Sequence, residues 1–385
     1  MRKEFLPFSP PFVGEEEVEA AVQALRSGWI TTGPRAKEFE TAFAARLGAP
    51  GALALSSCTA ALHTALVTLG IGPGDEVVTT PITFAASANV IEHTGARPVF
   101  VDVEPDTLNL DPAAARAAVT PRTKAILPVH FTGHPCEMDA IHALASEHGL
   151  AVVEDAAHAL PARYRGKLVG SSANPVAFSF YATKNLTTAE GGMLTGEPTF
   201  LDRARVVALH GMSRDAWRRY ERGGSWRYDI ELPGFKYNMP DLLAAIGLVQ
   251  LRRLEAMQKR REEVVAAYAK AFAGHAALEV PVRRSHVDPA WHLYVLRLRL
   301  DRLTIDRDTF LEKMREQNIG CSVHFIPLHT QPFYRRKYKL QPDDFPVAYG
   351  NFTRMLSLPL HPGLTDQDVA DVADAVLEVA SRHAR

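Results

Sequence analysis

Short apolar runs alternate with longer helical patterns through residues 15–195, and this alternation restricts the fold more than any other feature of the chain. Most of the runs are continuously apolar, as strands covered on both faces of a sheet are. Strand–helix alternation over this length predicts an α/β sheet with right-handed crossovers. The runs that we predict as strands are Ala52–Leu55, Glu76–Thr80, Pro98–Val103, Ala125–His130, Ala151–Glu154, Val176–Phe180 and Gly192–Thr195.

The helical patterns between these runs stop at glycines, which commonly close a helix because they adopt the left-handed conformation at little cost. We predict helices at Glu15–Ser27, Thr59–Leu69, Phe84–His93 and Glu137–His148. The glycines at their expected ends are Gly28, Gly70, Gly95 and Gly149.

The pattern changes after Pro240, where a long helix is predicted from Asp241 to Phe272 and is expected to act as a hinge. A chain of 385 residues is too long for one hydrophobic core. We therefore predict two domains, residues 1–245 with the main sheet and residues 246–385 with a smaller α+β fold. The other elements expected in the second part are an antiparallel strand at Trp291–Leu300, a helix at Asp306–Gln317, a short strand around Cys321–Phe325 and a last helix at Thr365–His383.

Composition and charge argue against several classes of protein. The formal net charge of -1 gives no reason to expect nucleic acid or an anionic membrane as a partner. No apolar run reaches the roughly 18 residues of a membrane span, and the N-terminus lacks the apolar core of a secretory signal. The odd, widely separated cysteines (Cys58, Cys136 and Cys321) are typical of reduced thiols, so we expect a cytoplasmic protein.

In open α/β sheets the ligand lies beyond the carboxyl ends of the strands, so the residues that follow each strand are the first candidates. The segment Ser56–Thr59 opens a predicted helix, where free N–H groups suit a phosphate, although alone it is better interpreted as a plain helix cap. Asp155 ends an apolar strand, where its carboxylate could meet a cationic ring nitrogen or simply cap a helix.

Lys184 follows the strand Val176–Phe180, and a surface charge explains it poorly because another strand begins shortly after it. A lysine can form an imine with an aldehyde cofactor when its surroundings permit the neutral amine. Ser179 is near enough in sequence to reach the phosphate of the same cofactor. The loop 234–241 is aromatic and basic, and a polar turn capping the long helix is an equally plausible interpretation of it.

Together these residues indicate a site for pyridoxal 5'-phosphate. The chain resembles the sugar-nucleotide aminotransferases of the DegT/StrS type, which have the α/β fold of type-I pyridoxal-phosphate transferases: a mostly parallel seven-stranded sheet in a large domain and a smaller α+β C-terminal domain. The resemblance covers nearly the whole chain. It is carried by Gly28-Trp29-Ile30-Thr31-Thr32-Gly33-Pro34, Gly70 to Val77, Glu154-Asp155-Ala156-Ala157-His158, Ser179 to Asn185, Glu190-Gly191-Gly192 and Tyr237-Asn238 with Asp241.

Within this family the chain is most similar to the UDP-4-amino-4-deoxy-L-arabinose aminotransferase branch. The resemblance implies transamination of a nucleotide-linked keto sugar, a UDP-4-keto sugar in that branch, with L-glutamate as amino donor and 2-oxoglutarate as product. It also implies a homodimer with shared active sites. The motifs behind the branch assignment are His210-Gly211-Met212, Asp215-Ala216-Trp217, Ala290-Trp291-His292-Leu293, His324-Phe325 and His329-Thr330-Gln331.

The resemblance also implies a role for each matching residue. Lys184 would form the Schiff base with the cofactor and Asp155 would pair with its pyridine nitrogen. Asn238 would reach the phosphate in the neighbouring subunit. The other implied contacts are Cys58, Thr59 and Ser179 at the phosphate, Phe84 and His158 at the ring, and Thr31, Tyr181, Lys236, His324 and His329 at the substrate.

Departures from the family pattern leave the substrate open. Tyr181-Ala182-Thr183 replaces the commoner His-Pro-Thr, and Cys58 stands where many relatives carry Gly or Ala. Alternatives of the same fold are an aminotransferase for a non-nucleotide carbonyl, a sugar dehydratase and a catalytically silent regulator. Lys184 argues against the dehydratase, because such relatives carry histidine at that position. His130, His134 and Cys136 lack an aligning helix and a fourth ligand, so we expect no metal.

Overall fold

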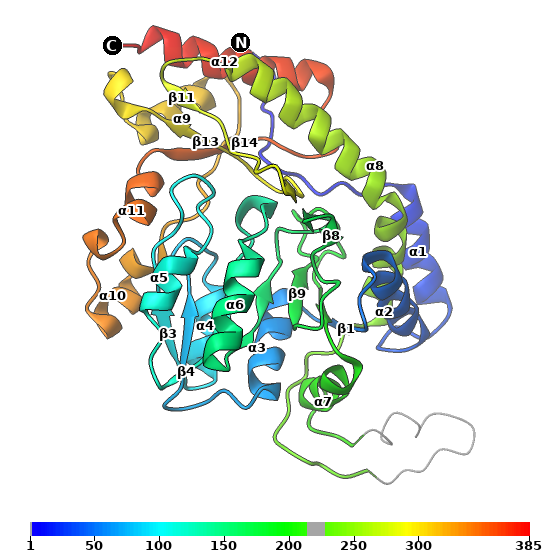
Figure 1. Ribbon diagram of the computed structural model, residues 1–385. Helices are drawn as coiled ribbons and strands as arrows, with labels where there is room; N and C mark the ends of the chain where they lie inside the picture. The colour runs from blue at the N-terminus through cyan, green and yellow to red at the C-terminus, as the bar shows by residue number, and fades with distance from the viewer. Residues whose placement is uncertain (1, 214–227) are drawn as a thin grey trace.

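The computed structural model describes residues 2–213 and 228–385, and its centre is a sheet covered by helices (Figure 1). Two four-stranded sheets meet at residues 151–155, because β5 pairs with β4 while β6 pairs with β9. The order across this surface is β1 (Ala52–Leu55), β10 (Gly192–Thr195), β9 (Val176–Ser179), β6 (Glu154–Asp155), β5 (Ala151–Val152), β4 (Thr123–Leu127), β2 (Glu76–Thr79) and β3 (Arg97–Phe100).

The pairing confirms the predicted α/β class with a mostly parallel sheet. β10 runs antiparallel to both β1 and β9, and the other pairs are parallel. Every strand predicted between residues 52 and 195 is found, although the run Ala151–Glu154 is interrupted at Val153, where the chain passes from one sheet to the other. This crossing brings the carboxyl ends of β6 and β9 together.

Helices cover both faces of the sheet because successive strand residues point in opposite directions. Leu53 of β1 packs in the cluster with α3, whereas Ala54 packs in the cluster with Phe39 and Phe43 of α2. The four predicted closing glycines all have positive φ angles, which confirms their role. The helices of this part are α1 (Glu15–Arg26), α2 (Pro34–Leu47), α3 (Cys58–Thr68), α4 (Ala86–His93), α5 (Pro112–Ala117), α6 (Met138–His148) and α7 (Pro198–Ala208).

The long helix α8 (Asp241–Phe272) has the predicted bounds and lies beside α1 and α2 at one end and α12 at the other (Figure 1). In its last turns, Tyr268 packs with Tyr294 in a core separate from those of the main sheet. The other elements there are β11 (Leu278–Glu279), β13 (Tyr294–Leu298), β14 (Met355–Leu358), α9 (Arg307–Glu316), α10 (Pro332–Tyr338), α11 (Pro346–Phe352) and α12 (Asp366–Arg382). A small sheet joins β7 (Arg163–Tyr164), β8 (Lys167–Leu168) and β12 (Val287–Asp288).

Several predicted elements differ from those in the structure. The segment Cys321–Phe325 is not a strand, because its only recorded ladder contact in the described chain is the bridge between Ser322 and Ser357. The strand expected from Trp291 begins at Tyr294, since the residues before it donate hydrogen bonds to Thr132 and Gly133 instead. The helix expected from Phe84 begins at Ala86.

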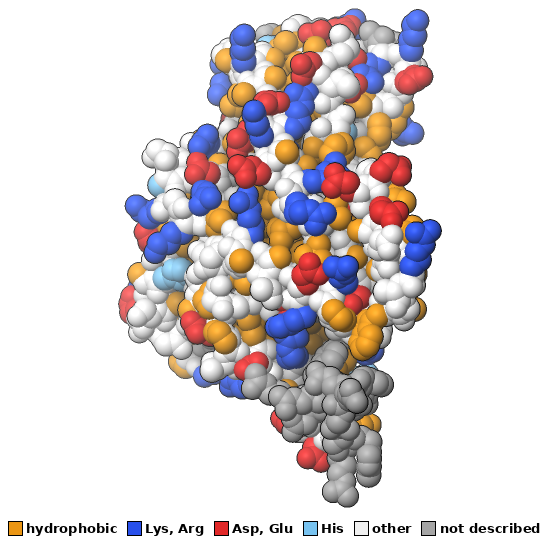
Figure 2. Space-filling view, turned by 90° about the vertical axis from the view of Figure 1, so that its right-hand side faces the viewer, with side chains coloured by type: hydrophobic (Ala, Val, Ile, Leu, Met, Phe, Trp, Pro, Cys, Tyr) orange, Lys and Arg blue, Asp and Glu red, His pale blue; other side chains and the backbone are white. Residues whose placement is uncertain are grey.

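Figure 2 shows the side of the molecule that carries α1, α2 and α8, where charges of both signs are interspersed with apolar side chains. Across residues 2–213 and 228–385, no helix combines the length and the apolar character needed to cross a bilayer.

Candidate active site

Lys184 lies in the loop that follows β9, and this loop returns at once into β10. The backbone N–H of Phe180 donates to the carbonyl of Gly191, and the N–H of Lys184 donates to Tyr181 at 2.9 Å. These bonds fix the two ends of a tight loop at the carboxyl edge of the sheet. The Lys184 side chain is partly buried, and its Nζ lies 3.5 Å from Nε2 of His292.

Asp155 ends β6, the neighbouring strand, and its carboxylate is buried. Oδ2 accepts a hydrogen bond of 2.7 Å from the hydroxyl of Ser87 in α4, and Oδ1 accepts one of 3.1 Å from the N–H of Ala157. The thiol of Cys58, in the first turn of α3, lies 3.9 Å from Oδ1. Residues from two helices and a strand thus converge on one carboxylate, as buried charges require.

Burial lowers the pKa of the Lys184 amine to about 8, and the nearby Cys58 and Asp155 oppose part of that shift. An amine with this pKa is partly neutral near physiological pH, and only the neutral form can attack a carbonyl. Burial raises the pKa of the Cys58 thiol well above its usual range, and Asp155 adds to this effect. The structure therefore brings together the predicted Lys184, Asp155 and Cys58, with the lysine as the reactive nucleophile.

The N-terminus of α3 lies beside Lys184 and Asp155, and it carries backbone N–H donors that are available to a ligand. Ser57 caps the helix by accepting a 3.0 Å bond from the N–H of Ala60. Within the described chain, the N–H groups of Cys58 and Thr59 have no recorded acceptor. Gly192 of β10 permits the close approach, because a Cβ there would lie 2.4 Å from the carbonyl carbon of Ser57. Ser179 faces the same corner, as the pairing partner of Gly192.

Three histidines surround the lysine from the other side. The rings of His158 and His292 lie 4.4 Å apart, and the His158 ring stacks on Phe325 at 5.8 Å. Burial and the charge of Lys184 hold the pKa of His158 and His292 well below the usual range, and the same two causes lower that of His324 to about 4. All three rings are therefore neutral at pH 7. Nδ1 of His158 is buried without a protein partner in the described chain.

Other predicted residues lie farther from this centre or on the surface. Phe84 is 64% exposed, which leaves its ring face free for a ligand, and its ring contacts Phe325 at 6.1 Å. Tyr181, Thr31 and Lys236 are exposed. Asn238 pairs with Leu55 at the end of β1, and its Oδ1 accepts a hydrogen bond of 2.6 Å from Lys236.

His329 is not brought to this group. Its ring packs against Phe345 at 4.8 Å, and its Nε2 lies 3.2 Å from the carbonyl of Pro342. The predicted motif Asp215-Ala216-Trp217 lies outside the described residues.

Sequence reasoning missed Ser87, Asn185 and His292 as members of the site. Ser87 gave no signal, because it lies within a helix. His292 was quoted only as part of the motif Ala290–Leu293, although it contacts both Lys184 and Asn185. His292 would have been found if every polar residue of a family motif had been treated as a candidate site residue.

The histidine–cysteine loop 130–136 is held by protein partners. Nε2 of His130 lies 3.0 Å from the carboxylate of Glu154, and the thiol of Cys136 donates to the carbonyl of Val129 at 3.2 Å. Within residues 2–213 and 228–385, no group of three or more metal-binding side chains is found.

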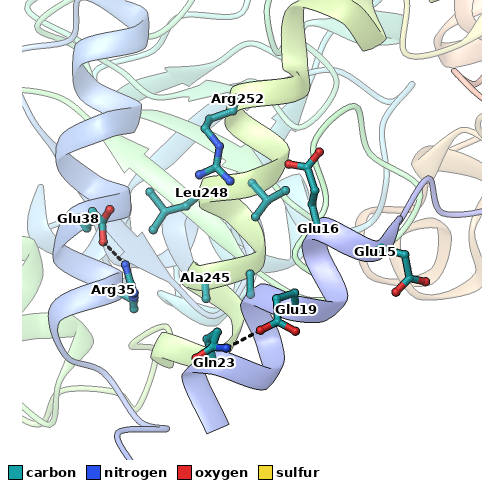
Figure 3. A pocket seen from close by; sticks show the side chains of 11 residues that line it. Glu15, Glu16, Glu19, Gln23, Arg35, Glu38, Ala245, Leu248 and Arg252 are labelled. Atoms are coloured by element: carbon teal, nitrogen blue, oxygen red, sulfur yellow. Dashed lines mark hydrogen bonds and ion pairs between the residues drawn. The ribbon is translucent and has the colours of Figure 1, made fainter. Parts of the chain in front are cut away.

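A groove with a volume of about 520 Å³ lies elsewhere, between α1, α2 and α8 (Figure 3). Side chains of both charges surround an apolar floor, and Arg35 forms an ion pair with Glu38 at its rim. None of the candidate site residues lines it, so its size does not make it the active site. Its labelled side chains are Glu15, Glu16, Glu19, Gln23, Arg35, Glu38, Ala245, Leu248 and Arg252.

Comparison with known proteins identifies the family of this chain. Residues 11–377 match the model of the DegT/DnrJ/EryC1/StrS aminotransferase family. The chain belongs to this family. The match spans nearly all of the sequence and confirms the resemblance carried by the motifs around Asp155 and Lys184.

The similar proteins of this aminotransferase family include a spore coat polysaccharide biosynthesis protein, SpsC of Bacillus subtilis, which is 51% identical and covers 98% of each chain. A putative sugar aminotransferase from Streptococcus pneumoniae, solved in its PMP form, has a TM-score of 0.92 at 35% identity and covers 98% of this chain and 99% of its own. DesV of S. venezuelae, solved with a ketimine intermediate, has a TM-score of 0.88 at 36% identity and covers 98% of this chain and 100% of its own. The fold is therefore that of the type-I pyridoxal-phosphate transferases.

The residues of this family member fit the same cofactor. A phosphate matches the free N–H groups of α3, and a pyridinium nitrogen matches the buried carboxylate of Asp155. The orphan Nδ1 of His158 provides a further polar contact beside Lys184. The amine of Lys184, the carboxylate of Asp155 and the turn before α3 each follow a different strand. The fold places all three at one edge of the sheet.

Proposed function

We propose that this protein transfers an amino group from L-glutamate to a nucleotide-linked keto sugar, with a UDP-4-keto sugar as the first candidate. It is a pyridoxal-phosphate-dependent sugar aminotransferase. The observation that carries the proposal is the convergence of Lys184 and Asp155 beside the N-terminus of α3. Membership of an aminotransferase family and its sugar-processing relatives supports the substrate class.

The bound cofactor supplies an aldehyde that condenses with amines and a ring that accepts an electron pair. Lys184 would hold the cofactor through its amine, and Nζ, when free, would serve as the base that takes a proton from the donor carbon. Asp155 would keep a proton on the ring nitrogen, because an adjacent carboxylate stabilises the cationic form. The hydroxyl of Ser87 holds that carboxylate in place. The neutral His158 ring offers a hydrogen-bonding atom without adding charge.

Lys184 also argues against two of the alternatives, the sugar dehydratase and the silent regulator. A sugar dehydratase of this fold is expected to carry histidine at that position. A silent regulator would not need an amine whose pKa is lowered to about 8. Transfer to a carbonyl that lacks a nucleotide remains the second candidate for the substrate.

A substrate panel tests the proposal directly. The protein loaded with cofactor is incubated with L-glutamate and a series of UDP-, dTDP- and GDP-linked 4-keto and 3-keto sugars, and 2-oxoglutarate release is followed. We expect turnover with a nucleotide-linked 4-keto sugar and none with the Lys184→Ala variant. Turnover only with carbonyls that lack a nucleotide would overturn the substrate assignment, and normal turnover of Lys184→Ala would overturn the mechanism.

We propose further that two copies assemble and that Asn238 serves the site of its neighbour. Its position at the end of β1, next to exposed Lys236, supports this arrangement. Mixing the inactive Lys184→Ala protein with an inactive Asn238→Ala protein tests it. A shared site predicts recovered activity, because one site in each mixed dimer regains both residues. A site built from one chain predicts none.

A further inference from the structure

The amide of Asn185, which follows the reactive lysine, has a fixed orientation. Its Nδ2 donates a 2.7 Å hydrogen bond to the carbonyl of Ala290, so its Oδ1 must face the other way. That oxygen lies 3.1 Å from Nδ1 of His292. A carbonyl oxygen can only accept, and therefore Nδ1 of His292 carries the ring proton.

The other ring nitrogen of His292 is then a free acceptor. Nε2 lies 3.5 Å from Nζ of Lys184. Because burial keeps the imidazole neutral, Nε2 presents a lone pair and not a proton to the amine. An ammonium has three N–H donors and no acceptor, so this geometry favours the protonated form of Lys184 as the donor in the pair.

His292 is also held in place by the chain around it. The backbone N–H of His292 donates to the carbonyl of Thr132 at 2.9 Å, and the guanidinium of Arg261 donates to the backbone carbonyl of His292 at 3.5 Å. The ring of His158 covers one side at 4.4 Å. The backbone contacts fix the main chain of His292, and the bond to Asn185 together with the His158 ring leaves the imidazole little freedom to turn away from the lysine.

We propose that His292 is a positioning residue for Lys184: Nε2 accepts a hydrogen bond from the ammonium of Lys184 and holds Nζ toward the reacting carbon while the lysine carries a proton. No proton passes to the ring. The amine would take the proton from the donor carbon, share one N–H with Nε2 while it carries the charge, and give the proton up to the cofactor carbon, which leaves Lys184 neutral again. The role in transamination rests on the proposed function, whereas the contact itself does not.

The experiment uses the full chain without cofactor and measures the pKa of Lys184. An amine-reactive reagent labels the protein over a range of pH, and mass spectrometry follows the peptide that contains Lys184. The titratable groups around the amine are Cys58, Asp155, His158, His292 and His324. The variants are His292→Leu, which removes the acceptor, and His292→Gln, whose Oε1 reaches the position of Nε2.

We expect His292→Leu to lower the labelling midpoint of Lys184 by on the order of one pH unit, because the charged form loses its hydrogen bond. His292→Gln should restore the midpoint. In the loaded enzyme, kcat should fall about tenfold in the leucine variant and recover to within about threefold in the glutamine variant, with KM for the sugar unchanged. His134→Asn, at a buried histidine with no recorded contact to Lys184, is the control and should leave the midpoint unmoved.

An unchanged midpoint in His292→Leu, or a glutamine variant as impaired as the leucine variant, would overturn the proposal. If the leucine variant fails to fold by circular dichroism, Asn185→Leu replaces it, since that change releases the ring tautomer and should lower the same midpoint. The labelling result stands even if no sugar nucleotide is a substrate. Failure of the proposed function and failure of this inference are therefore distinguishable.

Discussion

The hydroxyl of Ser87 donates a hydrogen bond of 2.7 Å to Oδ2 of Asp155. Oγ of Ser87 also lies 2.7 Å from the hydroxyl of Thr83, and because Ser87 has only one proton to give, Thr83 must be the donor in that second contact. A relay of two hydroxyls thus supports the carboxylate of Asp155, which we propose as the partner of the cofactor's ring nitrogen. The relay begins in the turn before α4 and ends at the carboxyl end of β6.

Replacing Ser87 with alanine should lower kcat about tenfold. A hydrogen bond to a charged group contributes about 1.5 kcal/mol, and its loss leaves the buried carboxylate of Asp155 less well oriented. Steady-state kinetics with saturating donor and sugar would measure the change. Ser171→Ala, which removes a hydroxyl bonded to the carbonyl of Leu168, is the control and should keep normal turnover. Equal rates for both variants would show that the relay has no part in catalysis.

The amine of Lys184 should set the pH dependence of cofactor uptake. Its pKa is lowered to about 8, and only the neutral amine condenses with an aldehyde. The rate of uptake by the cofactor-free protein should therefore rise about tenfold per pH unit below 8 and level off above it. Stopped-flow absorbance at a series of pH values would record this profile. A midpoint near the ordinary value of 10.5 would contradict the buried position of the amine.

Gly192→Ala should damage both stability and cofactor binding. A Cβ there would lie 2.5 Å from the backbone nitrogen of Cys58, so β10 and the first turn of α3 must separate. We expect a loss of about 2 kcal/mol in the free energy of unfolding, in the range of overpacked sites, and weaker cofactor binding. Urea denaturation and a cofactor titration would measure these effects. The matched control is Gly350→Ala, where a Cβ meets nothing within 4 Å. A stable Gly192→Ala protein with normal affinity would refute the close approach.

Local patterns predicted those parts of the fold that local physics determines. The helix Asp241–Phe272 has the expected bounds because its periodicity runs unbroken from Pro240. The closing glycines were also correct, since a positive φ is a property of the single residue. The segment 321–325 was wrongly predicted as a strand, since a strand requires a partner along its length and Ser322 alone forms a bridge among these described residues. The strand β14 was not predicted, because its pairing with β13 comes from a distant part of the chain.

The same distinction applies to the site. Lys184 and Asp155 each follow a strand, and the rule that ligands lie at the carboxyl ends of strands was enough to single them out. His292 belongs to the site through Asn185, which precedes it by 107 residues, and no local pattern records that contact. The role of His329 at the substrate stays a prediction that rests on a motif alone, and its ring packs beside Phe345.

Buried neutral histidines should make the protein sensitive to acid, and His134 offers the clearest test. Burial lowers its pKa from 6.5 to about 4, while an unfolded chain keeps the ordinary value. Between these values the unfolded state binds a proton that the folded state does not, so the free energy of unfolding falls as the pH falls. Each such histidine contributes at most about 1.4 kcal/mol per pH unit.

His134→Asn should reduce this sensitivity, because asparagine does not titrate while its amide can replace the Nδ1 bond to the carbonyl of Pro135. Urea denaturation of both proteins at pH 7, 6 and 5 would give the comparison. Between pH 7 and 5 the variant should lose up to about 2 kcal/mol less than the parent protein, since only the pH range below 6.5 contributes. Parallel losses in the two proteins would mean that folding does not lower the pKa of His134.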